Sequence, residues 1–89
     1  PSLKQPAAEE ILLEGLMWLE AATKQVDDSF WEERDIQERL ASLLDSCWRS
    51  HQTKLRRNQK AFDAFKSLLK DLANRQNKVA MELQLRMLK

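Results

Sequence analysis

The sequence predicts an all-α chain in which a short N-terminal helix folds back antiparallel on a very long helix. Three observations predict this class. No Gly or Pro occurs in residues 16–89, and these two residue types interrupt helices most readily. One third of the residues are charged, as in coiled coils and other long helices. Apolar side chains recur three and four residues apart along most of the chain, which is the helical period.

The first helix is predicted over residues 6–25. Pro6 suits the first turn of a helix, where its missing amide hydrogen is not needed. The apolar side chains from Ile11 to Val26 spread over more than one face of this helix, so we expect neighbours on more than one side. Gly15 stands among them, although glycine lowers helix stability by about 1 kcal/mol relative to alanine. We therefore expect a neighbouring helix to approach the backbone closely at Gly15.

A tight turn is predicted over residues 26–28. The acidic pair before Ser29 favours a helix cap. Ser29 and Glu32 also have the spacing of a capping box, in which each side chain binds the other residue's backbone amide. The first helix should then return antiparallel along the next one, with Leu16 facing the region of Leu40.

One very long helix is predicted over residues 29–88. From Leu55 onward its apolar residues alternate at spacings of three and four, which is the heptad pattern of a coiled coil. Two successive spacings of four around His51 form a stutter, which unwinds a coiled coil locally without ending the helix. The alternative is an uneven three-helix bundle with a break near residues 49–53, where polar, cap-forming residues follow one another.

The residues spaced three and four apart form an apolar ladder along the predicted long helix. Two polar residues, Asn58 and Gln76, stand at positions of this ladder that otherwise hold Phe, Leu and Val. A buried polar residue in a coiled coil fixes its register and oligomeric state at some loss of stability. The other interpretation is that both side chains are exposed where the helices separate. The sequence leaves both interpretations open.

Charge is divided between the two halves of the chain. Residues 1–45 hold eleven acidic and four basic side chains, a net charge of −7. Residues 46–89 hold eleven basic and three acidic ones, a net charge of +8. Opposite charges favour contact between the halves, within one chain or between chains. We expect the acidic first helix to meet the basic C-terminal half between chains.

Apolar surface is the main indication of function. The C-terminal segment carries two stripes on opposite faces, one through Val79 and Leu83 and one through Met81, Leu85 and Leu88. One coiled-coil seam cannot bury both, so a further helix should dock there. Trp18, like the other tryptophans, is interpreted as an anchor of the core or of an interface. The predicted interface residues are Leu12, Leu16, Trp18, Leu19, Phe62, Phe65, Leu69, Leu72, Val79, Met81, Leu83, Leu85 and Leu88.

Catalytic and metal chemistry find little support in the sequence. Cys47 and His51 are four residues apart and would share one face of a helix. The chain has no second Cys and no second His, whereas a structural zinc site takes four ligands. We expect both residues to pack in the core, and we predict no catalytic residue, metal or cofactor.

A basic cluster gives the alternative function, nucleic-acid binding. Its members are spread around the helix and lie beside Trp48 and Phe62; an acidic protein partner would suit them as well. The residues in question are Arg49, Lys54, Arg56, Arg57 and Lys60.

The sequence as a whole predicts a non-catalytic oligomerisation and protein-interaction module, spanning residues 1–89, of a larger scaffold or adaptor protein. We expect a homo-oligomer, with a dimer as the first hypothesis, and a helical protein partner. A single cysteine indicates a reducing compartment, cytoplasmic or nuclear. No apolar run approaches the length needed to span a bilayer, so no membrane contact is expected.

Overall fold

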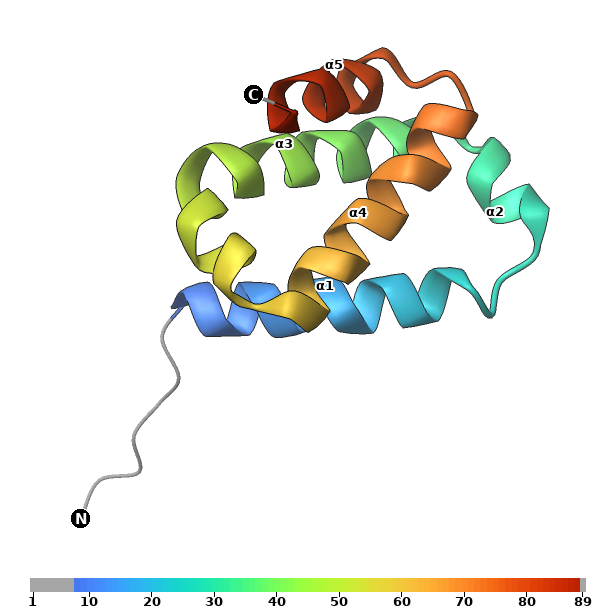
Figure 1. The fold of residues 1–89 in the computed structure, drawn as a ribbon. Helices are drawn as coiled ribbons and strands as arrows, with labels where there is room; N and C mark the ends of the chain where they lie inside the picture. Colours follow the sequence, from blue (N-terminus) through green and yellow to red (C-terminus); the bar gives the residue numbers. More distant parts are fainter. Residues whose placement is uncertain (1–7, 89) are drawn as a thin grey trace.

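Short connections separate the helices, which pack around a shared apolar core (Figure 1). The computed structural model describes residues 8–88. Its elements are α1 (Ala8–Thr23), α2 (Asp28–Glu32), α3 (Arg34–Arg57), α4 (Gln59–Asn74) and α5 (Lys78–Met87). The predicted all-α class is confirmed, while the predicted helix start at Pro6 lies outside the described residues. Within the described range, no helix combines the length and the apolar character needed to cross a membrane.

The first helix, α1, packs more extensively against α4 than against α3. In Figure 1, α1 and α3 run in opposite directions, and α4 crosses between them. Leu13 and Leu16 of α1 are buried. The Ser67 hydroxyl of α4 donates a hydrogen bond to the Glu20 carboxylate of α1 over 3.1 Å. The hairpin prediction is therefore corrected, because α1 packs mainly on a helix that is distant in sequence.

The predicted continuous helix over residues 29–88 is wrong. The chain is divided there into α2, α3, α4 and α5, with breaks at Glu33, at Asn58 and at residues 75–77. Within α3, His51 has non-helical backbone angles (φ −133°, ψ 21°) and kinks the helix. The stutter in the apolar spacing coincides with this kink, but α3 continues to Arg57. The alternative break near residues 49–53 is thus a kink, and the chain reverses several residues later.

Two asparagines cap the helices that follow the breaks. The Asn58 side chain accepts a hydrogen bond from the Ala61 amide at 3.1 Å, and the Asn77 side chain accepts one from the Ala80 amide at 3.0 Å. Both asparagines have extended backbone angles, as N-cap residues do. Asn58 is therefore a helix cap at a chain reversal, and neither predicted interpretation of it holds.

Gln76 ends α4 through a left-handed backbone conformation (φ 64°). The Asn77 amide donates to the Leu72 carbonyl over 3.1 Å, and the Gln76 amide donates to the Ala73 carbonyl over 2.9 Å. This pair of hydrogen bonds is the Schellman motif, in which glycine usually occupies the left-handed position. Gln76 therefore forms a chain reversal without glycine, so the sequence shows no helix-breaking residue at the point where α4 ends.

Asp27 is the residue that caps α2. Its carboxylate accepts a hydrogen bond from the Ser29 amide at 3.0 Å, and its backbone is extended. Ser29 lies inside α2, so the predicted capping box of Ser29 with Glu32 is wrong by two residues. The connection between α1 and α2 nevertheless falls close to the predicted turn at residues 26–28.

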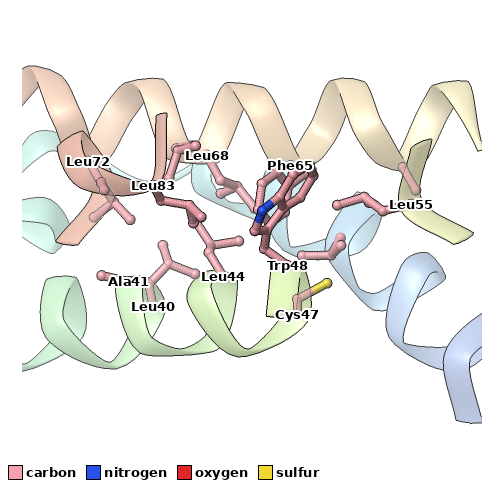
Figure 2. Close-up of a cluster of buried hydrophobic side chains, with 14 of the residues drawn as sticks. Leu40, Ala41, Leu44, Cys47, Trp48, Leu55, Phe65, Leu68, Leu72 and Leu83 are labelled. Carbon is pink, nitrogen blue, oxygen red and sulfur yellow. The ribbon is translucent and has the colours of Figure 1, made fainter. Parts of the chain in front are cut away.

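The core is built largely from α3, α4 and α5 (Figure 2). Trp48 of α3 stacks on Phe65 of α4, with ring centroids 6.0 Å apart. Leu83 of α5 belongs to the same buried cluster and is fully buried. Of the tryptophans interpreted as anchors, Trp31 and Trp48 are buried, whereas Trp18 is 72% exposed. Trp18 is therefore available to a partner.

Candidate docking groove between α4 and α5

The structure divides the predicted interface residues into three groups. Leu16, Phe65, Leu69, Leu72 and Leu83 are buried within the chain. Leu12, Leu19 and Phe62 are partly buried against the core. Trp18, Val79, Met81, Leu85 and Leu88 are exposed. The central residues of the predicted heptad seam thus pack inside one chain, which leaves the exposed group as candidates for docking.

A groove of about 830 Å³ runs between α4 and α5. Its α4 wall is Phe62, Lys66, Leu69 and Lys70, and its α5 wall is Met81, Gln84, Leu85, Met87 and Leu88; Arg56 of α3 lies at one end. Of the exposed predicted interface residues, Met81, Leu85 and Leu88 line this groove.

The α5 wall is apolar because this short helix is apolar on two faces. Ala80 and Leu83 face the core and have no exposed surface. Met81, Leu85 and Leu88 lie along the groove, and Leu85 and Leu88 are 64% and 83% exposed. The outer stripe and the burial of Leu83 were predicted from the sequence, but Val79, predicted to share the face of Leu83, is 42% exposed, and Ala80 packs in the core instead. In the described part of the chain nothing covers the outer stripe.

The α4 wall is continuous with the core. Leu69 is buried at the bottom of the groove. The Phe62 ring is half-buried and stacks on Trp48, with centroids 6.4 Å apart and ring planes inclined by 14°. Because these rings are held by the core, the groove has a preformed apolar wall that a ligand would not need to order.

The rim of the groove is basic. The Arg56 guanidinium lies over the Trp48 ring, 4.8 Å from its centroid. The Lys66 ammonium lies 4.8 Å from the centroid of the Phe62 ring and 3.7 Å from the Asp63 carboxylate. Lys70 adds a third cation, and none of the described residues that line the groove is acidic. The apolar floor is therefore edged by positive charge.

An ion pair ties the α5 wall to α3. The Arg86 guanidinium lies 3.0 Å from the Asp45 carboxylate, and the same carboxylate lies 2.9 Å from the Arg49 Nε. Exposed pairs of this kind stabilise by less than about 1 kcal/mol. The side on which α5 presents its apolar stripe is set mainly by the burial of Ala80 and Leu83.

The predicted basic cluster is dispersed in the structure. Arg49 pairs with Asp45, and Arg56 faces the groove. Lys54, Arg57 and Lys60 are exposed elsewhere on the surface. Of this cluster, only Arg56 belongs to the groove.

Cys47 and His51 do not form a recognisable reactive pair. Cys47 is buried among core residues, and burial raises the pKa of its thiol, so the reactive thiolate is disfavoured. His51 stands at the kink of α3, where the regular four-residue geometry of the helix is lost. Within residues 8–88, no cluster of three or more His, Cys, Asp or Glu side chains is placed to hold a metal ion.

Sequence reasoning missed several groove residues. Lys66, Lys70, Gln84 and Met87 line the groove but were not among the predicted site residues. One signal was available, because Lys66 and Lys70 lie four residues apart and beside Leu69, which places all three near one face of a helix. The position of the α5 wall opposite α4 could not be predicted, since it depends on where α5 folds back.

No protein-family model, curated protein or solved structure matches the chain. A function is therefore inferred from this geometry alone.

Proposed function

We propose that this chain is a non-catalytic protein-interaction module whose groove between α4 and α5 binds an acidic amphipathic helix. The observation that carries the proposal is the exposed apolar stripe of α5, set against a preformed aromatic wall and edged by cations. Exposed apolar patches with polar rims are typical of protein-docking surfaces. A helix that lies in such a groove inserts side chains spaced three and four residues apart.

The groove dimensions suit a helix of a few turns. Met81 and Leu88 are seven residues apart on α5, a distance of roughly 10.5 Å along the helix axis. A bound helix of three or four turns would cover this length and bring acidic side chains within reach of Lys66 and Lys70. Such contacts at the rim steer association and choose between partners more than they add affinity.

Nucleic-acid binding, the alternative drawn from the sequence, receives less support. Of the basic cluster, Arg49 is engaged by Asp45 and Arg56 stacks on Trp48. A nucleic-acid surface would instead align cations along a phosphate backbone. Strong retention on a heparin column at low salt, abolished by Arg56→Glu with Arg57→Glu, would favour this alternative over helix binding.

A pair of synthetic peptides tests helix binding directly. The first is a helix of about 18 residues with leucines three and four residues apart and glutamates on its flanks; this length is enough to form helix in a groove. The second carries lysines in place of the glutamates. We expect amide chemical shifts of α4 and α5 to move with the acidic peptide, and calorimetry to give an affinity at least about tenfold weaker for the basic one.

Two variants of the protein complete this experiment. Leu85→Ser with Leu88→Ser removes the outer stripe of α5 and should abolish binding of the acidic peptide. Leu43→Ser is the matched control, because Leu43 is an exposed leucine on α3 that does not line the groove. Equal binding of both peptides, or equal losses in both protein variants, would contradict the proposal.

A further inference from the structure

The outer face of α1 is a second exposed apolar surface, distant from the groove in sequence. Ile11 and Trp18 are 57% and 72% exposed, although residues of these types are normally covered. They lie seven residues apart, so they share one face of α1. Gly15 lies between them and is exposed, and a Cβ atom built on it would meet nothing within 4 Å. This face therefore has two large side chains with a gap between them.

One edge of this α1 face is acidic. Glu10 and Glu14 are exposed and, four residues apart, lie side by side along the helix. The Trp18 indole donates a hydrogen bond to the Glu14 carboxylate over 3.5 Å, which places this charge beside the apolar stripe. The outer face of α1 thus has the chemistry expected of a ligand for the groove: apolar along its centre and acidic along one side.

We propose that the groove between α4 and α5 is occupied by α1 of a second copy of this chain. The inference rests on the proposed function and names its partner. Charge complementarity carries it, because Glu10 and Glu14 would meet a groove that is edged by Lys66 and Lys70 and has no acidic side chain among its described lining residues. The opposite net charges of the two halves of the chain arise partly from these residues.

Shape supports the same pairing. Ile11, Gly15 and Trp18 follow one another at spacings of four and three, as do Met81, Leu85 and Leu88. With the two helices side by side, the exposed Leu85 side chain meets the gap at Gly15, while Ile11 and Trp18 flank it. A small residue opposite a large one allows close helix packing. The close approach that Gly15 suggests is thus made between chains, since none occurs among residues 8–88 of the same chain.

The two surfaces are different parts of the molecule, so each contact joins the groove of one copy to α1 of another. Each chain would offer one groove and one α1 face. Two copies that exchange both contacts form a closed dimer, whereas copies that share one contact at a time form rings or open chains. The predicted dimer is therefore one of the assemblies that this contact allows, and sedimentation of the unmodified chain distinguishes it from a larger assembly.

Two variants of the 89-residue chain, each with one surface disabled, test this arrangement. The groove variant carries Leu85→Asp with Leu88→Asp, and the helix variant carries Ile11→Asp with Trp18→Asp. All four positions are exposed, so the fold should survive, which circular dichroism checks. We expect each variant alone to sediment as a monomer. Their mixture retains one intact α1 face and one intact groove, and we expect it to form a one-to-one complex.

The alternatives predict different masses. A symmetric contact between two grooves would leave the helix variant dimeric on its own, and a symmetric contact between two α1 faces would leave the groove variant dimeric. Either result, or a mixture that stays monomeric, would overturn the proposal. Binding of the acidic peptide by the helix variant separates this failure from failure of the proposed function, because that binding needs only the groove.

Discussion

Phe65 and Phe62 lie three residues apart on α4, yet they face two different environments. Phe65 is fully buried between α3 and α4, where Trp48 stacks on it. Phe62 contacts the same tryptophan with one side and lines the open groove with the other. Apolar spacing thus reveals where apolar side chains lie on a helix, but only the neighbouring helix decides whether that surface is closed. The closed side should govern stability, and the open side should govern binding.

Removing a side chain from the closed side should have the largest effect. Phe65→Ala deletes a fully buried ring, and such changes destabilise by about 3–5 kcal/mol. Domains of this size have a total stability of only about 4–12 kcal/mol. We therefore expect Phe65→Ala to shift urea unfolding, followed by far-UV circular dichroism, to much lower concentration or to abolish folding at 37 °C.

The matched change on the open side is Leu85→Ala. Leu85 is exposed in a single chain, so its free energy of unfolding should change by no more than about 0.5 kcal/mol. The measurement is made at concentrations where the chain is monomeric. If Leu85→Ala were as destabilising as Phe65→Ala, the groove would be part of the core and the comparison would fail.

A gain of stability is expected on the outer face of α1. Gly15→Ala removes the helix penalty of glycine, about 1 kcal/mol, and the added methyl meets no atom within 4 Å. For a domain of this size the gain corresponds to an increase in Tm of about 4–8 °C. The Leu85→Asp, Leu88→Asp background keeps association from contributing.

Ala21→Gly serves as the control for this change, because Ala21 is also exposed on α1. It should lower the free energy of unfolding by a similar amount. A loss of stability in Gly15→Ala, with the expected loss in Ala21→Gly, would mean that another part of the same chain packs closely on Gly15.

These regions also show how far the sequence can be interpreted. The spacing of apolar residues sufficed to predict an all-α fold and the outer stripe of α5. It did not reveal the chain reversals at Asn58 and Gln76, because neither contains Gly or Pro and both fit the ladder. Asn58 acts through a side-chain cap, and Gln76 through a left-handed backbone. Neither residue type excludes a continuous helix, so packing of α4 against α3 and of α5 against both is needed to select the reversal.

The groove was harder to predict than the fold for the same reason. Its α4 and α5 walls were assigned from the sequence to one continuous helix, on which Phe62 and Leu85 would lie more than 30 Å apart, at about 1.5 Å per residue. The reversal at Gln76 brings them to the same groove. Candidate residues were therefore predicted, but their arrangement was not.

A smaller gain of stability is expected at this reversal. Gln76→Gly relieves the left-handed conformation, which is unfavourable for residues with a Cβ atom by about 1–2 kcal/mol. Part of this gain is offset because glycine makes the unfolded chain more flexible. We expect a net increase of about 0.5–1 kcal/mol in the free energy of unfolding. Glu38→Gly, in the second turn of α3, is the control and should destabilise by about 1 kcal/mol.

The smallest effect should be a local response to acid at Asp27, far in sequence from the groove. Hydrogen bonds from the Ser29 hydroxyl and then from its amide hold the pKa of Asp27 below its ordinary value. A lowered pKa means that the charged form stabilises the fold; this contribution is complete above the unfolded-state pKa and is lost as the pH falls through the lowered one. Between about pH 6 and about pH 2.5, a range that spans the usual pKa of aspartate, the Ser29 amide signal should therefore shift with a midpoint below that usual pKa. Asp27→Asn keeps a capping oxygen without a titrating group, so this shift should disappear in that variant. The same shift in Asp27→Asn would assign the response to another carboxylate and remove Asp27 as its cause.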